Sequence, residues 1–213
     1  MFLGRVAAAL RGADLPASIG PDDVPEIRFE DPIAVFEQEA VAVSTEVTRA
    51  RPGEALATVA RVFEAAGANC FIAWDQLDGF LPGVEASLEG WGLERIDAGV
   101  SADPEARKLD HARVGTVAIG ITGADLAIAA SGSVMLIHGP GRPRSASLLV
   151  EHHIVLLPAA RIVDSLIEAM SRVTWEHTSN VAIITGPSRT GDIDSVLTLG
   201  VHGPRHLHVI VIE

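Results

Sequence analysis

Short apolar runs separated by turn-forming residues are the feature that most constrains the fold of this chain. They are rich in Ile, Val, Leu and Ala, and Gly, Ser or Pro separates one from the next. Continuous apolar runs of this length predict strands buried on both faces, as in parallel sheets. The clearest of them cover residues 116–122, 126–130, 133–138 and 153–157. The sequence therefore predicts a central, mostly parallel sheet.

Helical patterns alternate with these predicted strands. Residues 52–66 repeat apolar side chains at helical spacing, with Pro52 suited to the first turn and Gly67 to the position after the end. The alternation predicts a single α/β domain over residues 41–213, with helices flanking the sheet. Residues 1–40, rich in Pro, Asp and Glu, predict a variable, loosely packed lead-in with a short helix, available for contacts between copies of the chain. Further strands are predicted at 70–74, 93–96, 181–184 and 208–212, and further helices at 160–172 and in a short segment ending at 88.

Length, hydropathy and charge limit the class of protein. A chain of 213 residues can bury one sizeable core. Mean hydropathy is high at +0.31, but the longest apolar stretch, residues 117–138, is interrupted by Asp125 and by glycines, so no membrane span is expected. The first residues lack the basic start and apolar core of an export signal, which favours a cytoplasmic location. The net charge of −12 argues against nucleic-acid binding, which depends on Lys and Arg contacts with phosphates.

Two residue types that carry cofactor chemistry occur once each. Cys70 is the single cysteine, and one cysteine cannot hold an iron–sulfur cluster, which needs several cysteine ligands. Lys108 is the single lysine and lies in a predicted exposed loop at 103–110, whereas a Schiff-base lysine is desolvated. The sequence therefore predicts a chain without a cofactor of its own.

Residues 180–200 carry the strongest candidate binding motif. An apolar strand at 181–184 is followed by a glycine turn and then by apolar side chains at positions 193, 196 and 197, the spacing of a helix face. Free N–H groups at the start of that helix would converge with three side chains of the turn on a carboxylate or phosphate. Those side chains are Ser188, Arg189 and Thr190.

Asp192 narrows the chemistry of this turn. Gly186 and Gly191 have the spacing of a nucleoside-triphosphate loop, but Asp192 and Ile193 stand where that loop has Lys and Ser or Thr. A carboxylate cannot neutralise phosphates, so ATP hydrolysis is not expected here. The simpler interpretation, that Thr190 or Asp192 only caps the helix, stays open.

Two further turns contain candidate ligand-binding residues. Thr122, Gly123 and Asp125 follow a predicted strand, where Asp125 could orient a hydroxyl or accept a proton, or simply cap a helix. Ser131 and Gly132 lie between two predicted strands and could bind an anion through backbone N–H groups, or only complete a tight turn.

One arginine and three histidines complete the candidates. Arg144 lies in a basic, hydroxyl-rich loop that could close over a site and hold a carboxylate in two-point contact, or remain a solvated loop. His202, His206 and His208 lie within seven residues, but their spacing matches no recognised ligand pattern, so no metal is predicted. His202 is the better candidate for a catalytic role, as a neutral imidazole that relays a proton.

Four motifs occur in series in the second half of the chain: GITGADLAIAASGSV at 120–134, HIV at 153–155, GPSRTGDID at 186–194 and GVHGP at 200–204. In this order they resemble the lactate-utilisation protein C family, whose domain is also called the LUD domain. The resemblance is densest over residues 110–213 and extends to the first hundred residues only in general layout.

The resemblance implies a fold like that of sugar-phosphate isomerases, coenzyme A transferases and methenyltetrahydrofolate synthetase. It also implies a bacterial system that oxidises L-lactate to pyruvate, in which the two partner subunits are cysteine-rich and hold iron–sulfur clusters. One departure is Ala130, where many members of the resembled family place a glutamate that could act as nucleophile or base. Alanine can do neither, which favours a binding role over transferase chemistry.

The expected function is a non-redox subunit of that system, which binds a small carboxylate or phosphate between the turn at 188–190 and the turn at 122–123. Two alternatives stay open. The first is an independent enzyme of the isomerase, transferase or cyclo-ligase type, acting on a phosphorylated or coenzyme A-linked metabolite. The second is a structural or regulatory subunit without a ligand.

Overall fold

A computed structural model describes residues 26–99, 101–174, 176, 178–191, 197–200 and 202–213, with residues 190–191 and 197–199 described by their backbone alone. Its helices are α2 (Pro32–Ala42), α3 (Pro52–Ala66), α4 (Val84–Gly90), α5 (Pro104–Val114), α6 (Ser145–Leu148) and α7 (Leu166–Ser171). Its strands are β1 (Glu46–Ala50), β2 (Cys70–Ala73), β3 (Glu94–Arg95), β4 (Ile119–Gly123), β5 (Leu126–Ile128), β6 (Ser133–His138), β7 (His152–Pro158), β8 (Ile162–Val163), β9 (Asn180–Ile184), β10 (Arg189–Gly191), β11 (Leu197–Leu199) and β12 (His206–Ile212). Three 3-10 turns are η2 (Leu77–Gly79), η3 (Ala129–Ser131) and η4 (Ala159–Arg161). None of the described helices is both long and apolar enough to cross a membrane.

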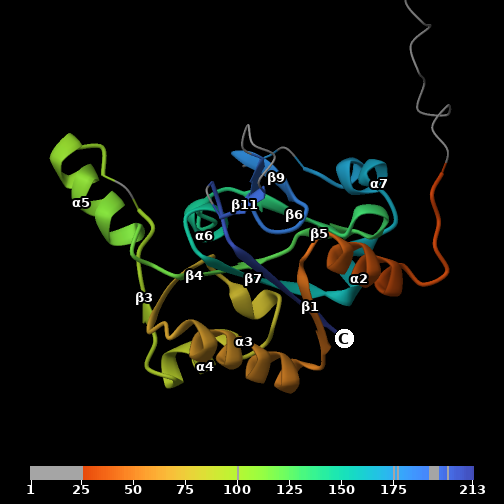
Figure 1. The fold of residues 1–213 in the computed structure, drawn as a ribbon, viewed down its shortest axis with the longest axis horizontal. Coiled ribbons are helices and arrows are strands. Elements are labelled where there is room, and N and C mark those ends of the chain that lie inside the picture. The colour runs from red at the N-terminus through yellow and green to blue at the C-terminus, as the bar shows by residue number, and fades with distance from the viewer. Residues whose placement is uncertain (1–25, 100, 175, 177, 192–196, 201) are drawn as a thin grey trace, which may run out of the picture.

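A six-stranded sheet forms the centre of the molecule, in the order β1-β12-β7-β4-β2-β3 (Figure 1). Every neighbouring pair of its strands is parallel. All five residues of β4 are buried, as are the five inner residues of β7. Burial on both faces is what a near-continuous apolar strand requires, so the prediction of a mostly parallel central sheet is confirmed.

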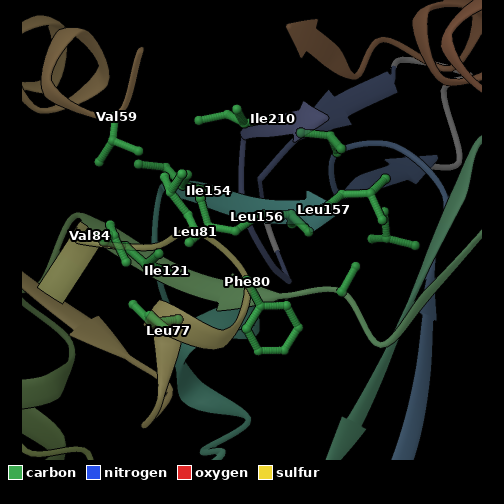
Figure 2. Close-up of a cluster of buried hydrophobic side chains, with 14 of the residues drawn as sticks. Val59, Leu77, Phe80, Leu81, Val84, Ile121, Ile154, Leu156, Leu157 and Ile210 are labelled. Carbon is green, nitrogen blue, oxygen red and sulfur yellow. The ribbon is translucent and has the colours of Figure 1, made fainter. Parts of the chain in front are cut away.

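Helix α3 and the segment around α4 cover one face of this sheet. Figure 2 shows Val59 of α3 and Val84 of α4 packed with Ile121, Ile154 and Ile210 from three of the strands. All five side chains are almost fully buried. Helix α3 has the bounds that its apolar spacing predicts, and Gly67 ends it in the left-handed conformation.

Helix α6 approaches the opposite face very closely. Gly120 alternates with Ile121 along β4 and so points away from α3. A Cβ atom at Gly120 would lie 1.8 Å from the carbonyl oxygen of Ala146 in α6. Only glycine allows this approach of helix backbone to strand.

A second sheet of four strands has the order β8-β5-β6-β9 and adjoins the central sheet through the β4–β5 connection (Figure 1). The sequence predicts strands in this region but not their separation into a sheet of their own. The pairing is mixed, because β6 is antiparallel to β5 and β9 while β8 is parallel to β5. Strand pairing is a long-range contact, which local periodicity does not contain.

The helix predicted after Gly191 is wrong where the structure describes that segment. Residues 197–199 form β11, which pairs antiparallel with β10, and Arg189 lies opposite Leu199. Leu197 and Leu199 alternate at the spacing of a strand, a signal that competes with the helical spacing of positions 193, 196 and 197. The predicted helix N-terminus at residues 192–196 lies outside the described residues.

Three other segments differ from prediction. Residues 104–114 form helix α5 instead of the predicted loop (Figure 1). The carboxylate of Asp103 accepts hydrogen bonds from the first N–H groups of this helix, and Pro104 occupies its first position. Lys108 is exposed, as predicted. Residues 32–42 form α2 instead of a loosely packed lead-in, with Asp31 as its cap and a fully buried Phe36. The helix predicted at 160–172 divides into η4, β8 and the shorter α7.

The close approach of α6 to β4 predicts opposite effects for two glycine substitutions. Gly120→Ala should lower the free energy of unfolding by about 1–3 kcal/mol or more, because the new methyl group meets backbone that cannot move easily. Gly53→Ala, in the first turn of α3 with open space around its Cβ position, should raise it by about 0.5 kcal/mol. Urea denaturation followed by circular dichroism measures both. Equal stability of the two variants would contradict the packing described here.

Candidate functional site

The carboxyl-edge cavity, about 440 Å³ in volume, lies beyond the ends of β2 and β3. In open α/β sheets, ligands bind outside the carboxyl ends of the strands, so this edge is where a site is expected. One part of its wall comes from the loop after β6, with Gly139, Gly141, Arg142 and Pro143. The other part comes from the ends of β2 and β3 and the residues after them, and consists of Ala73, Asp75, Arg95, Ile96, Asp97, Ala98 and Gly99.

Arg142 is held in a fixed orientation at this cavity. Its Nη1 donates to Asp125 Oδ1 at 2.8 Å and to the carbonyl of Ile137 at 3.3 Å. The same Asp125 accepts from the N–H of Ile137 at 2.7 Å through its other oxygen. The guanidinium also stacks on Trp74, with its carbon 4.8 Å from the ring centroid. Among the described residues these contacts use only Nη1, so the Nε and Nη2 edge is available to a ligand.

Arg95 and Asp75 form the second charged pair of the cavity. Arg95 Nη2 donates to Asp75 Oδ1 at 2.6 Å and to the carbonyl of Ala73 at 3.0 Å. The N–H of Asp75 donates to the carbonyl of Gly141 at 2.8 Å, which joins the two parts of the wall. Gly141 has a φ of +72°, and a Cβ atom there would lie 2.4 Å from Asp75 Oδ2. This junction therefore requires glycine.

Each arginine of the cavity thus has its own carboxylate. The pairs Arg142–Asp125 and Arg95–Asp75 are close to neutral, and Asp97 adds a negative charge to the lining. A guanidinium edge with two free donors matches the two oxygens of a carboxylate. The arrangement can hold a small monoanion, and it offers no surplus positive charge for a dianion.

Thr122 and Gly123, two of the predicted ligand-binding residues, support this region from within. Thr122 Oγ1 lies 2.9 Å from Nε2 of His153, and both residues are fully buried. A Cβ atom at Gly123 would lie 2.1 Å from the Phe80 ring. Neither residue lines the carboxyl-edge cavity. Arg144 is exposed at the start of α6, two residues beyond the arginine that does line it.

Ser131 and Gly132 belong to the turn after η3, close to the end of α2. Gly132 has a φ of +59°, and a Cβ atom there would lie 2.1 Å from the backbone nitrogen of Ala40. Ser131 Oγ lies 2.8 Å from Ser133 Oγ, which in turn lies 2.7 Å from Thr185 Oγ1. The hydroxyl groups of this turn bond to one another across the second sheet.

Ser188 and Arg189 lie at the other edge of the parallel sheet. The N–H of Ser188 donates at 2.8 Å to the carbonyl oxygen of Pro204, which lies just before β12. Arg189 Nη2 donates to the carbonyl of Val43 at 2.5 Å and to Ser44 Oγ at 2.6 Å, just before β1. The residues that Ser188 and Arg189 contact lie just before the amino ends of β12 and β1, whereas Thr122 and Gly123 lie at the carboxyl end of β4. The structure therefore does not bring the turn at 188–190 and the turn at 122–123 together. The side chain of Thr190 and all of Asp192 lie outside the described residues.

His202 lies in an amino-edge cavity of about 760 Å³, formed by the segments that lead into β4, β7 and β12. It is exposed, and Arg205 and Glu151 lie nearby, with Arg205 Nη1 3.6 Å from Glu151 Oε1. The other catalytic candidate, Asp125, lies beyond the opposite edge. The two candidates therefore do not act on one small ligand.

Arg142, Arg95 and Asp75 are not among the site residues predicted from the sequence, although Arg142 is one of four arginines near turns in its second half that could meet a small anion. The available signal was the position of Asp75 and Arg95 directly at the ends of predicted strands. The sequence gives a weaker signal for Arg142. Its difference from Arg144 is an ion pair with Asp125, which is distant in the sequence.

Two buried histidines lie beside this region. His153, on β7, is fully buried, and burial lowers its pKa from 6.5 to about 3. Its Nδ1 has no hydrogen-bond partner among the described residues. Burial also lowers the pKa of His138, whose ring packs edge-on against Trp74. Both rings are therefore neutral at neutral pH.

The chain matches the LUD domain family over residues 33–212, and it belongs to that family. The lactate utilization protein C of Shouchella clausii is 30% identical to it over 193 residues, which cover 85% of this chain and 79% of the relative. The protein of the same name from Halalkalibacterium halodurans is 30% identical over 233 residues, covering 100% and 96%. A crystal structure of a DUF162 family protein from Deinococcus radiodurans has the same fold, with a TM-score of 0.62 and 23% identity over 85% of this chain and 96% of that one.

The buried histidines predict a loss of stability in mild acid. The unfolded chain takes up protons near pH 6.5, whereas folded His153 does so only near 3, so stability should fall as pH decreases below about 6.5. Each such histidine contributes a slope of up to about 1.4 kcal/mol per pH unit. Urea unfolding between pH 7.5 and 5 measures the slope, and His153→Gln should make it shallower. Identical slopes for the two proteins would show that His153 titrates normally when folded.

Proposed function

We propose that this chain takes part in lactate utilisation as a non-redox subunit, and that it binds lactate or a similar small carboxylate in the carboxyl-edge cavity. Membership of the LUD domain family and the names of the relatives support the process. The orientation of Arg142 by Asp125 is the observation that supports the ligand class.

Arg142 is suited to a carboxylate because its geometry is fixed before the ligand arrives. Asp125 and Trp74 hold the guanidinium, so little side-chain entropy is lost on binding. The Nε and Nη2 donors would form two parallel bonds with the carboxylate of the ligand. Asp75, which also lines the cavity, can accept a hydrogen bond from the hydroxyl of a 2-hydroxy acid.

The local charge favours this ligand over a phosphorylated metabolite. A phosphate group carries nearly two negative charges, and the lining already contains the carboxylates of Asp75 and Asp97. The arginines are already paired and Asp97 makes the lining net negative, so a dianion would be repelled more strongly than a monoanion. Ala130, exposed at η3, also provides no nucleophile for transferase chemistry.

Electron transfer is assigned to other subunits in this proposal. Oxidation of lactate to pyruvate needs an electron acceptor, and Cys70 alone cannot ligate an iron–sulfur cluster. Two cysteine-rich subunits with iron–sulfur clusters would accept the electrons, while this chain positions the acid.

Growth on lactate in a strain that carries Arg142→Ala measures this contribution, and unimpaired growth would favour a structural subunit instead.

Titration calorimetry with L-lactate tests the proposed ligand directly. Arg142→Ala should weaken binding about 10-fold to 100-fold, since a hydrogen bond to a charged group is worth about 1.5–3 kcal/mol. Asp125→Asn should weaken it less, because the guanidinium remains but loses its orientation. Arg144→Ala is the matched control, an exposed arginine outside the cavity, and should bind like the parent protein.

Two results would contradict the proposed ligand. One is equal affinity of the parent protein and Arg142→Ala for L-lactate. The other is tighter binding of a sugar phosphate or an acyl-coenzyme A than of lactate, lost in the same variant, which would identify an independent enzyme of the transferase or isomerase type.

A further inference from the structure

Three histidines and a glutamate gather at the amino-terminal edge of the parallel sheet. His206 and His208 alternate along β12, so their side chains point to the same face. His152 begins β7 in register with His206, and Glu46 begins β1 in register with His208. The cluster therefore comes from three adjacent strands, at the edge opposite the carboxyl-edge cavity.

The side chains are close enough to share one ion. One ligand atom from each histidine lies within 4.8 Å of those of the other two. Nδ1 of His152 is 3.3 Å from Nε2 of His208. Glu46 faces the Nδ1 atoms of the other rings, with Oε1 3.5 Å from His206 and Oε2 3.2 Å from His208. Within the described ranges this is the one group of three or more such side chains.

We propose that His152, His206 and His208 bind a zinc ion, with Glu46 as the positioning residue for two of the rings. The ligand atoms are Nδ1 of His152 and Nε2 of His206 and His208. Imidazole nitrogen is a common zinc ligand, and three protein ligands leave the fourth position of a tetrahedral site open.

The separation between the two nearest nitrogens fits this geometry. Two nitrogens bound tetrahedrally at about 2.0–2.1 Å from zinc lie about 3.3–3.4 Å apart. Nδ1 of His152 and Nε2 of His208 are 3.3 Å apart and hydrogen-bonded, and their rings are 14° from parallel, so the rings must turn for both lone pairs to converge on an ion that replaces this bond. His206 stacks on His152 with 4.5 Å between ring centroids, and 45% of its side chain is exposed, so its ring has room to turn toward the same point.

Glu46 sets the tautomers that ligation needs. A carboxylate that faces Nδ1 accepts the Nδ1–H bond and leaves the lone pair on Nε2. This applies to His208, which hydrogen-bonds Glu46, whereas His206 Nδ1, 3.5 Å from Glu46 Oε1, is within ion-pair distance and must move closer to form the same bond. With Nδ1 as its ligand atom, His152 carries its proton on Nε2 in the bound state.

A cavity of about 240 Å³ under α3 adjoins the cluster and accommodates the fourth ligand. His152, His208 and Glu46 line it, together with Thr48, Thr58 and Arg61. Arg61 donates to Thr58 Oγ1 at 2.8 Å and brings a positive charge, which the carboxylate of Glu46 offsets. Water or a small anion fits this position.

Cobalt and zinc titrations of the chelator-treated, metal-free chain test the site. One Co²⁺ per chain should bind and give the visible absorption of tetrahedral cobalt, and Zn²⁺ should displace it. Glu46→Gln should weaken Zn²⁺ binding about 10-fold to 100-fold through loss of ring orientation, with one ion still bound. His206→Gln and His208→Gln should weaken it further, because each removes a ligand. His111→Gln, on exposed α5, is the control and should bind like the parent protein.

His206→Gln decides the outcome, because its exposed side chain allows the variant to fold. Circular dichroism checks that fold. Unchanged Zn²⁺ affinity in this variant would overturn the proposal, as would a folded parent protein that binds no Co²⁺. Both failures are independent of lactate binding at the other edge.

Discussion

The parallel pairing of β12 with β1 and β7 is the contact on which the rest of the structure depends. Among the described strands, β1 joins the six-stranded sheet through β12 alone. Because all six strands run the same way, their amino ends form one edge and their carboxyl ends the other. Any chemistry of this sheet is therefore divided between two edges, and the register decides which residues meet at each.

The two edges differ in their electrostatics. At the carboxyl edge, Arg142 and Arg95 are each paired with a carboxylate and still present donors to a cavity. At the amino edge, Arg189 is bonded to the segment between α2 and β1, so it ties two parts of the chain together. The difference explains why an exchangeable small acid is assigned to the first edge, although Ser188, Arg189 and Pro204 of the motifs that carry the family resemblance lie near the second.

Local patterns predict the elements of this fold better than its site. Helix 52–66 and most strands follow from apolar spacing, caps and glycine turns, all of which act within a few residues. Contacts between distant segments cannot be predicted from such local patterns. Asp125, for example, forms an ion pair with Arg142 and not with Arg144, although the two arginines are two residues apart. Likewise, Leu197 belongs to a helical spacing in the sequence but lies in β11, which pairs with β10. The second sheet is a consequence of such long-range pairing throughout.

A crystal structure of the chain grown with L-lactate tests the division between the two edges most directly. We expect the acid in the carboxyl-edge cavity, with its carboxylate against the Nε and Nη2 edge of Arg142 and its hydroxyl near Asp75. Lactate bound instead in the amino-edge cavity beside His202 and Arg205 would contradict this division.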